Sequence, residues 1–360
     1  MPSQEFADRR RRTADALRSG KLDALIVSAA PNVRYLSGFT GSNGVLLLLA
    51  DEAVLFTDPR YAIQAPEQSD CAVKVVRGPL YPALMKAAAR KRCRRIGFED
   101  ARLTFSGYEV LRAQLHLNAS LEPVSGLVER LRMVKSAHEI DVIRRSVELN
   151  STAFDRSIRQ LKPGMTEAAL AARIEYQMRL LGAEKPAFDT IVAAGPRSAL
   201  PHAQPTANPI RDNQLVLIDM GASREGYASD MTRMAFLGTP GRKVVRLYRA
   251  VLEAQLAALD AVRPGVTAGA VDRAARRVLR AAGMEKAFVH STGHGLGLEI
   301  HEGPRLGRRE KIPLVAGMAI TVEPGAYFEG VGGVRIEDTV VVTSSGCDVL
   351  TKTSKELLLL

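Results

Sequence analysis

The residues best suited to chemistry lie in STGHGLGLEIHEGP, residues 291–304, where two histidines stand seven positions apart among glycines. Glycine lets the backbone bend sharply and approach a ligand closely, because it has no Cβ. We therefore predict that His294, which has a glycine on each side, is a metal ligand. His301, and His202 in the separate segment ALPHAQPT, are better placed to contact a substrate. Taken alone, any of these histidines is equally compatible with an ordinary hydrogen-bonded role.

Two aspartates occur on an apolar stretch upstream, LVLIDMGASREGYASDMTRMAF, residues 215–236. The pattern predicts a β-hairpin with its turn at Ser-Arg-Glu-Gly, residues 223–226. Asp219 and Asp230 are symmetric about the centre of that turn. In a regular ladder they would face each other with Cβ atoms about 4.5–5.5 Å apart.

Two glutamates are arranged in the same way in a second stretch, GMAITVEPGAYFEGVGGVRIEDTVVVT, residues 317–343. Glu323 and Glu337 are symmetric about Gly330 in the predicted turn. The alternation of a strand places Glu337 on the same face as Arg335 and Thr339. Each hairpin is therefore expected to bring two acids to the middle of its own sheet.

Four carboxylates on apolar strands cannot all remain ionised without a counter-charge. Separate ion pairs or exposure to solvent would explain any single acid, and the nearby cations are Arg224, Arg233 and Arg335. Four acids on repeated hairpins, together with a glycine-rich histidine loop, favour two divalent cations instead. Mixed carboxylate and imidazole ligands suit Mn²⁺, Co²⁺, Fe²⁺ or Zn²⁺. Pairs of such ions about 3.5–4 Å apart are a known arrangement for hydrolysis.

The elements that position these acids belong to an internal repeat. Residues 161–183 align without gaps on residues 262–284, an offset of 101. Each copy reads as a Pro-Gly turn, a threonine that can cap the following helix, the helix itself, and a glycine that ends it. Each copy follows a long helix and precedes one of the hairpins. We expect the two units to pack about a pseudo-twofold axis with the hairpins meeting in the middle.

The length of 360 residues indicates two domains. Residues 1–126 read as an α/β domain, and a long amphipathic helical stretch at 127–161 opens a second domain, residues 127–360. The first domain is expected to contain mixed strands, and its segment 31–44 reads as a turn-rich loop. The predicted strands are 22–28, 44–50, 53–58 and the RRIGFED segment, and the predicted helices are 4–19, 79–90 and 105–115.

Composition limits the function classes. The net charge of +11 is spread over both halves, and its densest runs, at 9–12 and 90–95, contain no aromatic residues. This favours solvated surfaces over a nucleic-acid site. No apolar run is long enough to span a bilayer, and no apolar segment follows the basic N-terminus as in a secretory signal. Three scattered cysteines without a CxxC motif fit a reducing compartment. We therefore expect a cytoplasmic protein with no nucleic-acid or membrane partner.

The five motifs that carry the ligands resemble those of the pita-bread metallopeptidases. The closest branch is that of Xaa-Pro aminopeptidase and prolidase (Xaa-Pro dipeptidase). The motifs are LIDMG, ASDMTR, HSTGHGLGLEIHE, TVEPG and RIEDT, all present in order. The segments LDALIVSAAPNVRYLSGFTGS and TDPRYAIQA resemble the creatinase-like N-terminal domain of that branch. The resemblance implies an α+β protein with a creatinase-like α/β domain at 1–126 and a pita-bread catalytic domain at 127–360.

The resemblance also implies roles for individual residues. Two divalent ions per subunit are expected, with Mn²⁺ as the first choice and Co²⁺, Zn²⁺ or Fe²⁺ as alternatives. Asp230 and Glu337 would bridge both ions, Asp219 would complete one site, and His294 with Glu323 would complete the other. Glu323 would also act as the general base, His202 and His301 would hydrogen-bond the substrate carbonyl, and Arg335 would orient the carboxylates. Further candidates for substrate contact are His290, Arg305 and Tyr227.

The implied substrates are small peptides with proline in the second position. We favour an Xaa-Pro aminopeptidase over an Xaa-Pro dipeptidase from the overall character of the sequence. A dipeptidase needs a cation for the proline carboxylate, and Arg305 is a candidate. The N-terminal domain argues against a methionine aminopeptidase, and the complete ligand set argues against a creatinase. A non-catalytic pita-bread binding protein is the remote alternative, supported only by the basic charge. The resemblance further implies a homodimer.

Overall fold

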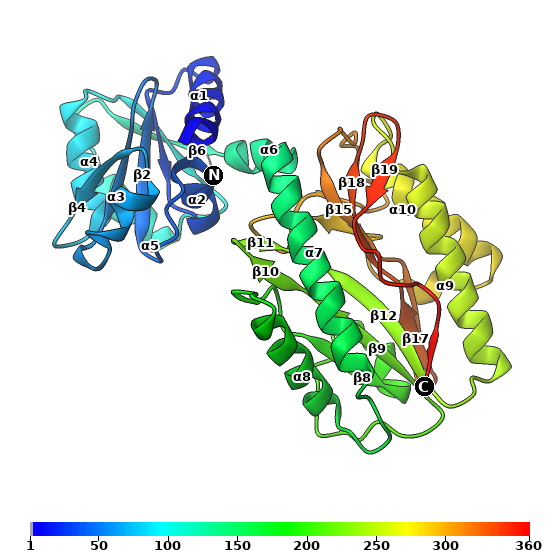
Figure 1. The fold of residues 1–360 in the computed structure, drawn as a ribbon. Helices are drawn as coiled ribbons and strands as arrows, with labels where there is room; N and C mark the ends of the chain where they lie inside the picture. Colours follow the sequence, from blue (N-terminus) through cyan, green and yellow to red (C-terminus); the bar gives the residue numbers. More distant parts are fainter. Residues whose placement is uncertain (1–2) are drawn as a thin grey trace. The chain divides into compact units, whose positions relative to one another are not determined.

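The computed structural model describes residues 3–360, and contacts within the chain form two compact units. Unit 1 is Met1–Arg132 and unit 2 is Met133–Leu360. In Figure 1, unit 1 runs from blue to cyan and unit 2 from green to red. Helix α6 (Leu127–Met133) belongs almost wholly to unit 1 by this division. The domain boundary after residue 126 remains a prediction, which separate expression of the two pieces would test.

Unit 1 is built on a six-stranded mixed sheet in the order β4-β3-β2-β1-β5-β6. β1 pairs antiparallel with β2 and parallel with β5. All four strands predicted from the sequence are present, and β4 and β6 extend the sheet at its edges. The strands are β1 (Ala24–Val27), β2 (Gly44–Leu49), β3 (Ala53–Thr57), β4 (Ala72–Val75), β5 (Arg95–Glu99) and β6 (Ser120–Val124).

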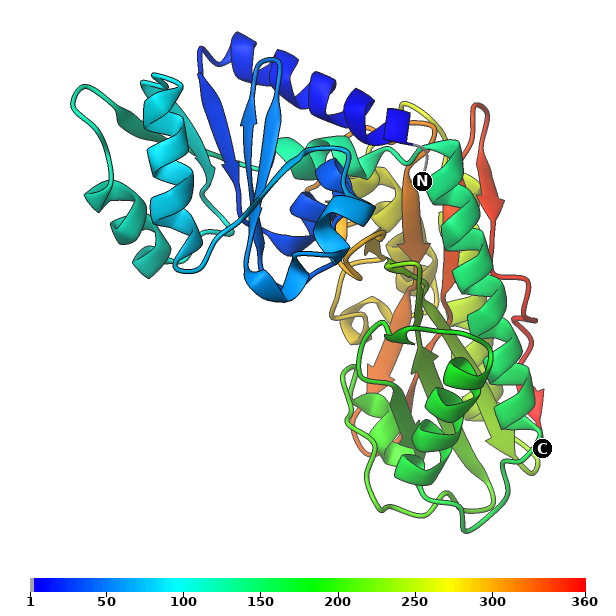
Figure 2. The same cartoon turned by 60° about the vertical axis from the view of Figure 1, so that its left-hand side comes forward.

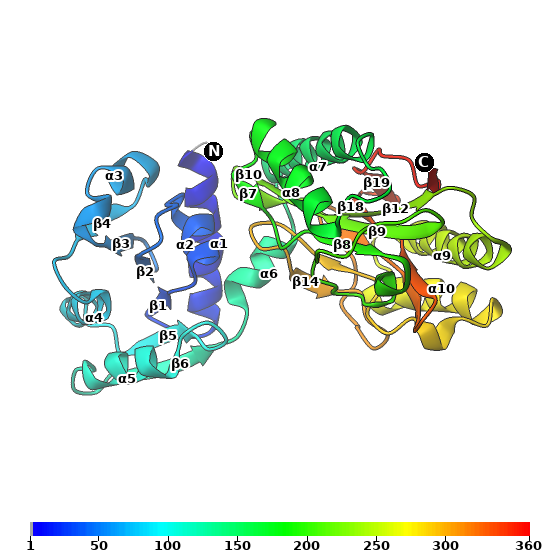
Figure 3. The ribbon, with the colours of Figure 1, turned by 90° about the horizontal axis from the view of Figure 1, so that it is seen from below.

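Helices cover both faces of this sheet. Figure 3 shows α1 and α2 on one side of the strands and α4 and α5 on the other, and Figure 2 gives a second view. Apolar side chains of α4 and α5, such as Leu84 and Leu111, are fully buried against β1–β3 and β5. The helices are α1 (Ser3–Ser19), α2 (Ala30–Ser37), the 3-10 turn Pro59–Tyr61, α3 (Gln64–Gln68), α4 (Leu80–Arg90) and α5 (Phe105–Ala113).

The segment 31–44 is only partly the loop that its composition suggests, because it contributes most of α2. Asn32 is fully buried there and donates to Glu99 Oε1 at 2.6 Å. The pair of backbone N–H groups at the start of α2, Ser28 and Ala29, also donates to Glu99. Glu99, at the end of β5, thus caps the N-terminus of α2. Because the two elements are far apart in the chain, the local sequence does not reveal this cap.

Unit 2 contains two helix pairs and two main sheets. α7 and α8 (green in Figure 1) pack on the sheet β20-β12-β9-β8. α9 and α10 (yellow) pack on the hairpin strands of the second repeat. The helices are α7 (Ala137–Ile158), α8 (Glu167–Leu180), the 3-10 turn Gly195–Ala199, α9 (Arg242–Ala261), α10 (Ala268–Ala281) and the 3-10 turn Glu285–Ala287.

The other main sheet has the order β14-β13-β15-β18-β19, and two small sheets, β11-β10-β7 and β16-β17, complete the unit. The strands are β7 (Lys185–Pro186), β8 (Ile191–Ala194), β9 (Gln214–Met220), β10 (Ala222–Arg224), β11 (Tyr227–Ala228), β12 (Met231–Leu237), β13 (His294–Gly295), β14 (Glu302–Arg305), β15 (Ala319–Val322), β16 (Gly325–Phe328), β17 (Gly332–Arg335), β18 (Asp338–Val342), β19 (Cys347–Val349) and β20 (Leu358–Leu359).

The internal repeat is visible in the helices. α8 and α10 begin and end at positions 101 residues apart, as the alignment predicts. Gly182 and Gly283 follow these helices with φ of 95° and 76°, the left-handed conformation that a terminating glycine adopts. The capping threonines differ: Thr166 accepts from Ala169 N, whereas the side chain of Thr267 makes no cap hydrogen bond. The predicted second cap is therefore wrong, although α10 still begins after Thr267.

The helical stretch predicted at 127–161 is interrupted before α7. Ser136 accepts from Glu139 N, and Glu139 Oε2 accepts from Ser136 N, which forms a capping box. These local hydrogen bonds start a new helix and override the continuous amphipathic pattern. Within residues 3–360, no helix combines the length and apolar character needed to cross a membrane.

Candidate active site

The first hairpin has a tighter turn than predicted. β9 pairs with β12 so that Asp219 lies opposite Thr232, and β10 pairs with β11 so that Arg224 lies opposite Tyr227. The turn is therefore Glu225-Gly226, whose φ values of 49° and 77° are both positive, as a two-residue hairpin turn requires. The prediction that Asp219 and Asp230 face each other directly is wrong. The residue opposite Asp219 is Thr232, two positions after Asp230. Because side chains alternate along a strand, Asp230 and Thr232 project from the same face, and Asp219 and Asp230 are diagonal neighbours.

The second hairpin has the predicted register. Val322 pairs with Asp338, and Gly325 pairs with Arg335. Glu323 and Glu337 lie between these pairs, at matching positions on the two sides of the hairpin. The predicted alternation is also confirmed, because Val334, Ile336 and Val340 enter the apolar core. The side chains of Arg335, Glu337 and Thr339 contact the first hairpin instead.

The two hairpins meet through side chains on these inward faces. Thr232 Oγ1 donates to Glu337 Oε2 at 2.7 Å, and Thr339 Oγ1 donates to the Asp230 carbonyl oxygen at 2.8 Å. Arg335 reaches across to Asp219 Oδ2 at 2.5 Å and also donates to Thr232 Oγ1. The acids of the two repeat halves therefore lie close together where the two hairpins meet, as the sequence predicts.

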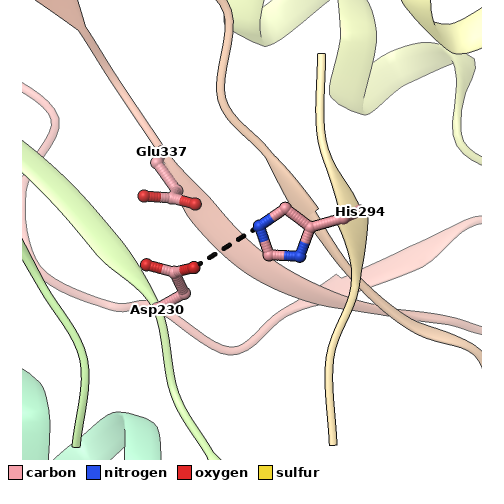
Figure 4. A group of neighbouring side chains, drawn as sticks. All are labelled: Asp230, His294 and Glu337. Atoms are coloured by element: carbon pink, nitrogen blue, oxygen red, sulfur yellow. Dashed lines mark ion pairs between the residues drawn. The ribbon is translucent and has the colours of Figure 1, made fainter. Parts of the chain in front are cut away.

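His294 enters the same place from β13 (Figure 4). Its Nδ1 lies 3.0 Å from the Gly295 carbonyl oxygen, which leaves Nε2 directed at the acids. Nε2 lies 3.6 Å from Asp230 Oδ2 and 3.4 Å from Glu323 Oε1. A Cβ on the preceding residue, Gly293, would lie 2.0 Å from the Thr321 carbonyl oxygen. The glycines therefore allow close packing of the histidine strand against β15.

The acids are buried enough to change their protonation. Burial, reinforced by neighbouring carboxylates, raises the pKa of Asp230 and of Glu337 well above the usual range. Burial also raises the pKa of Glu323 to about 7 and lowers the pKa of His294, so the imidazole is neutral and available as a ligand. Arg335 is the cation hydrogen-bonded to this cluster, through Asp219.

These residues fit divalent metal ions. One ligand atom from each of Asp230, His294 and Glu337 lies within 4.8 Å of the others. Asp219 Oδ1 is buried and has no hydrogen-bond donor, and a buried carboxylate oxygen without a partner is costly. Cations coordinated here would supply the charge and the contact that the side chains lack.

A cavity of about 580 Å³ opens onto the acids. Phe188 and Ile300 give it apolar wall, and Asp189 lies at an exposed position of its lining. His301 packs with its ring centroid 4.4 Å from that of His294, and Arg305 is exposed. The residues predicted from the sequence that line this cavity are Asp219, Asp230, His202, His290, His294, His301, Arg305, Glu323, Arg335 and Glu337.

Tyr227 is not among the residues that line the cavity. Its side chain is 1 % exposed, and its hydroxyl donates to Glu139 Oε1 at 2.9 Å. The prediction that it contacts substrate is therefore wrong. It lies in β11, immediately after the tight turn, and packs in an apolar cluster with α7.

Two residues of the site are not among those predicted from the sequence. Thr232 links Arg335 to Glu337, and Tyr327 accepts from Arg335 Nη1 at 2.8 Å. The Tyr327 hydroxyl also lies 2.8 Å from His290 Nε2. Burial lowers the pKa of His290 to about 4, so this histidine is neutral near pH 7. Alternation marks Thr232 as a neighbour of Asp230 on the same face, whereas the contact of Tyr327 with His290 depends on tertiary packing.

Metal binding should release protons. In the metal-free protein burial raises the pKa values of the Asp230, Glu323 and Glu337 carboxyls, that of Glu323 to about 7, so these groups keep their protons to a higher pH than exposed acids do. A metal requires the ionised forms, so apparent affinity should rise with pH as the protons leave. The histidines with lowered pKa values, His290 and His294, are already neutral and release none.

The release can be measured by titrating metal-free protein with Mn²⁺ at pH 6, 7 and 8 in two buffers of different ionisation enthalpy. The buffer-dependent part of the heat should be largest at low pH and should shrink as the pH rises past about 7, near the pKa of Glu323. Heat that is independent of the buffer at every pH would contradict these protonation states.

Comparison with known proteins agrees with this geometry. Residues 141–344 match Metallopeptidase family M24, and residues 9–134 match the Creatinase/Prolidase N-terminal domain. A Xaa-Pro dipeptidase of Pyrococcus horikoshii is 37 % identical over 340 residues, which cover 94 % of this chain and 95 % of the relative.

Two solved structures are similar over nearly the whole chain. The Xaa-Pro dipeptidase from Bacillus anthracis has a TM-score of 0.96 and 37 % identity, covering 99 % of this chain and 100 % of that one. The X-Pro aminopeptidase from Thermotoga maritima has a TM-score of 0.89 and 37 % identity, covering 95 % and 100 %. The predicted fold class, a pita-bread domain with a creatinase-like N-terminal domain, is confirmed.

Proposed function

Because the chain belongs to Metallopeptidase family M24, we propose that it hydrolyses the peptide bond of Xaa-Pro dipeptides. The observation that carries the proposal is that three buried acids, the partly buried Glu323 and His294 converge in the lining of one cavity of about 580 Å³. The sequence first favoured an aminopeptidase. The relatives support the dipeptidase better, since curated proteins 37 % and 38 % identical over 94 % of this chain are Xaa-Pro dipeptidases from two Pyrococcus species.

The metal site would hold two divalent ions, with Mn²⁺ preferred over Co²⁺, Zn²⁺ or Fe²⁺. The ligands would be Asp219, Asp230, His294, Glu323 and Glu337, with Asp230 and Glu337 shared. When bound, the ions would make water acidic enough to serve as a nucleophile near neutral pH and would polarise the scissile carbonyl. Arg335 would keep Asp219 in place, because its Nη2 lies 2.5 Å from Oδ2 of that acid.

The protein's own groups would move the proton. Burial raises the pKa of Glu323 to about 7 in the metal-free protein, and bound cations would lower it, so the carboxylate would be ionised and able to accept a proton. Glu323 would take the proton from the attacking water and pass it to the proline nitrogen as the C–N bond breaks. His202 and His301 line the cavity and would donate hydrogen bonds to the carbonyl oxygen as negative charge develops on it.

Recognition of a dipeptide needs a cation for the proline carboxylate. Arg305 lines the cavity from β14, and a guanidinium binds a carboxylate with two parallel hydrogen bonds. We propose that Arg305 fills this role. The free amine at the other end would be held by the acids of the site, with Asp189 an additional carboxylate in the cavity lining.

The test compares Leu-Pro with Leu-Pro-Pro as substrates of the Mn²⁺-loaded protein. We expect kcat/KM to favour the dipeptide at least about tenfold, since one ionic hydrogen-bonded contact contributes about 1.5–3 kcal/mol. Arg305→Ala should remove this preference mainly through KM, whereas Arg309→Ala, at an exposed position on the same segment, should not. If the wild type cleaved Leu-Pro-Pro as well as or better than Leu-Pro, the aminopeptidase hypothesis would be favoured over the dipeptidase. If it cleaved neither peptide, both hypotheses would be wrong.

Other parts of the proposal rest on the family resemblance and on composition. We propose a homodimer, which light scattering of the purified protein would test. Cys71, Cys93 and Cys347 are free thiols, in keeping with a proposed cytoplasmic location. We propose no nucleic-acid or membrane partner.

A further inference from the structure

We propose that two buried acids, Glu167 on α8 and Asp272 on α10, are positioning residues for the loops that carry the site histidines. Glu167 would set the loop of His202, and Asp272 would set the loop of His290 and His294. The inference rests on the proposed function, because it assigns these histidines separate tasks in binding metal and stabilising the reaction. It adds two residues that lie outside the cavity lining.

Glu167 accepts hydrogen bonds from both ends of the loop 195–206, which carries His202. Its side chain is fully buried at the start of α8. Its carboxylate accepts from Ala194 N at 2.9 Å, just before the loop 195–206, and from Thr206 N and Oγ1 at 3.1 and 2.8 Å, at its last residue. Asn208 Nδ2 is a further, longer donor at 3.4 Å. One carboxylate therefore joins the two ends of the loop 195–206.

An arginine completes this arrangement from within the loop. Arg197 Nε donates to both oxygens of Glu167, at 3.1 and 3.0 Å, and its Nη2 donates to the Gln204 carbonyl oxygen at 2.7 Å. His202 lies between these two residues. The neighbouring Pro201 carbonyl oxygen accepts from Arg335 Nη1 at 3.2 Å, which ties the loop to the site. The backbone on both sides of His202 is thus held by a network whose centre is Glu167.

Asp272 does the same for the other loop. It is also fully buried, in the second turn of α10. Oδ1 accepts from Thr292 N and Oγ1 at 3.1 and 2.9 Å, two residues before His294. Oδ2 accepts from Arg276 Nε at 2.7 Å, and Arg276 in turn donates to the carbonyl oxygens of Phe288 and His290.

The two networks have the same pattern of hydrogen bonds, although Glu167 and Asp272 are not at equivalent positions of the repeat. In each, a helix carboxylate accepts from the backbone N–H and the hydroxyl of one threonine, and an arginine held by that carboxylate donates to a carbonyl oxygen of the loop. Such fully hydrogen-bonded buried networks are rigid. The loops differ in what they carry: one brings a histidine that would touch the substrate, the other a metal ligand. Loosening them should therefore give different defects.

The experiment compares Glu167→Gln with Asp272→Asn. Each amide keeps one acceptor oxygen but turns an NH₂ group toward donors, so the loop shifts while the side-chain volume is kept. Matched controls are Glu175→Gln on α8 and Asp260→Asn on α9, at positions outside these networks. Mn²⁺ affinity of the metal-free proteins is measured by calorimetry, and kcat and KM for Leu-Pro are measured at saturating Mn²⁺.

Glu167→Gln should leave Mn²⁺ affinity within about twofold and lower kcat about tenfold or more, with little change in KM. Asp272→Asn should weaken Mn²⁺ binding about 10- to 100-fold, the usual effect of losing a residue that orients a metal ligand. In a His202→Ala background, Glu167→Gln should have almost no further effect on kcat, because contacts acting through one group are not additive. A full additional loss in that background would show a merely structural role and overturn the assignment of Glu167.

Two less disruptive variants test the proposal even if Glu167→Gln and Asp272→Asn fold poorly. Thr206→Val and Thr292→Val each remove one hydroxyl donor to Glu167 or Asp272 and should show weaker defects of the same two kinds. Wild-type behaviour of both threonine variants, or identical defects in the two amide variants, would overturn the inference. Failure of the proposed function is separate, since it would appear as an inactive wild type, while the predicted contrast in Mn²⁺ affinity would remain testable.

Discussion

Glu337→Gln should abolish metal binding and peptidase activity together while leaving the metal-free fold at least as stable as the wild type. Glu337 is 1 % exposed, and its Oε2 accepts from Thr232 Oγ1. As a proposed ligand shared by both ions, it contributes more than a residue that only orients a ligand, whose loss costs about 10- to 100-fold in affinity. We therefore expect Mn²⁺ affinity to fall more than about 100-fold and kcat/KM to fall at least as far.

The stability prediction follows from the sign of the pKa shift. Burial, then the charges of Glu323 and Asp219, raise the pKa of Glu337 above its ordinary value. The folded metal-free protein therefore holds a proton that the unfolded chain releases, and the wild type loses stability as the pH rises through the folded-state pKa. Glutamine has no such proton to lose, so this pH-dependent loss should be smaller in the variant.

Urea unfolding of metal-free wild type and variant at pH 5 and pH 8, with calorimetry for Mn²⁺, measures both parts of this prediction. Glu329→Gln is the matched control, since Glu329 lies exposed in the turn of the same hairpin. Its Mn²⁺ affinity and activity should equal those of the wild type. If Glu337→Gln binds Mn²⁺ as tightly as the wild type, Glu337 is not a ligand and the proposed metal centre is wrong.

His301→Ala should keep the metal and lose turnover. His301 lies at the exposed mouth of the cavity, and its ring packs against that of His294 with the centroids 4.4 Å apart. As a donor to the developing oxyanion, its removal should lower kcat about 10²- to 10³-fold. His301 is not one of the five proposed metal ligands, so Mn²⁺ affinity should change little.

Metal content after dialysis and steady-state kinetics with Leu-Pro check this prediction. His138→Ala on α7 serves as the control and should leave both measurements unchanged. If His301→Ala emptied the metal site, His301 would be a ligand, and the division between metal-binding and substrate-contacting histidines would have to be redrawn.

The parts of the site that sequence alone anticipated depend on local periodicity. Alternation along a strand and symmetry about a turn are properties of neighbouring residues, and they correctly placed Glu323 opposite Glu337 and turned Thr339 toward the first hairpin. The 101-residue offset likewise predicted both helices of the repeat, because each copy contains its own start and stop signals.

Local signals were ambiguous where two alternatives compete within a few residues. In the first hairpin, a four-residue turn at 223–226 and a two-residue turn at Glu225-Gly226 both fit the sequence. The structure adopts the second, because Glu225 and Gly226 take the left-handed conformations that match the twist of the strands. The choice moves the partner of Asp219 from Asp230 to Thr232.

The sequence of this protein by itself determined which residues can carry charge and bind metal, and on which face of each strand they lie. Only the tertiary structure decided which of them meet: it buried Tyr227 against Glu139, joined Arg335 to Asp219 across the repeat, and placed Glu167 and Asp272 under the histidine loops. The physical reason is that these contacts join residues far apart in the chain. Their partners are selected by the packing of whole helices and sheets, which no local pattern encodes.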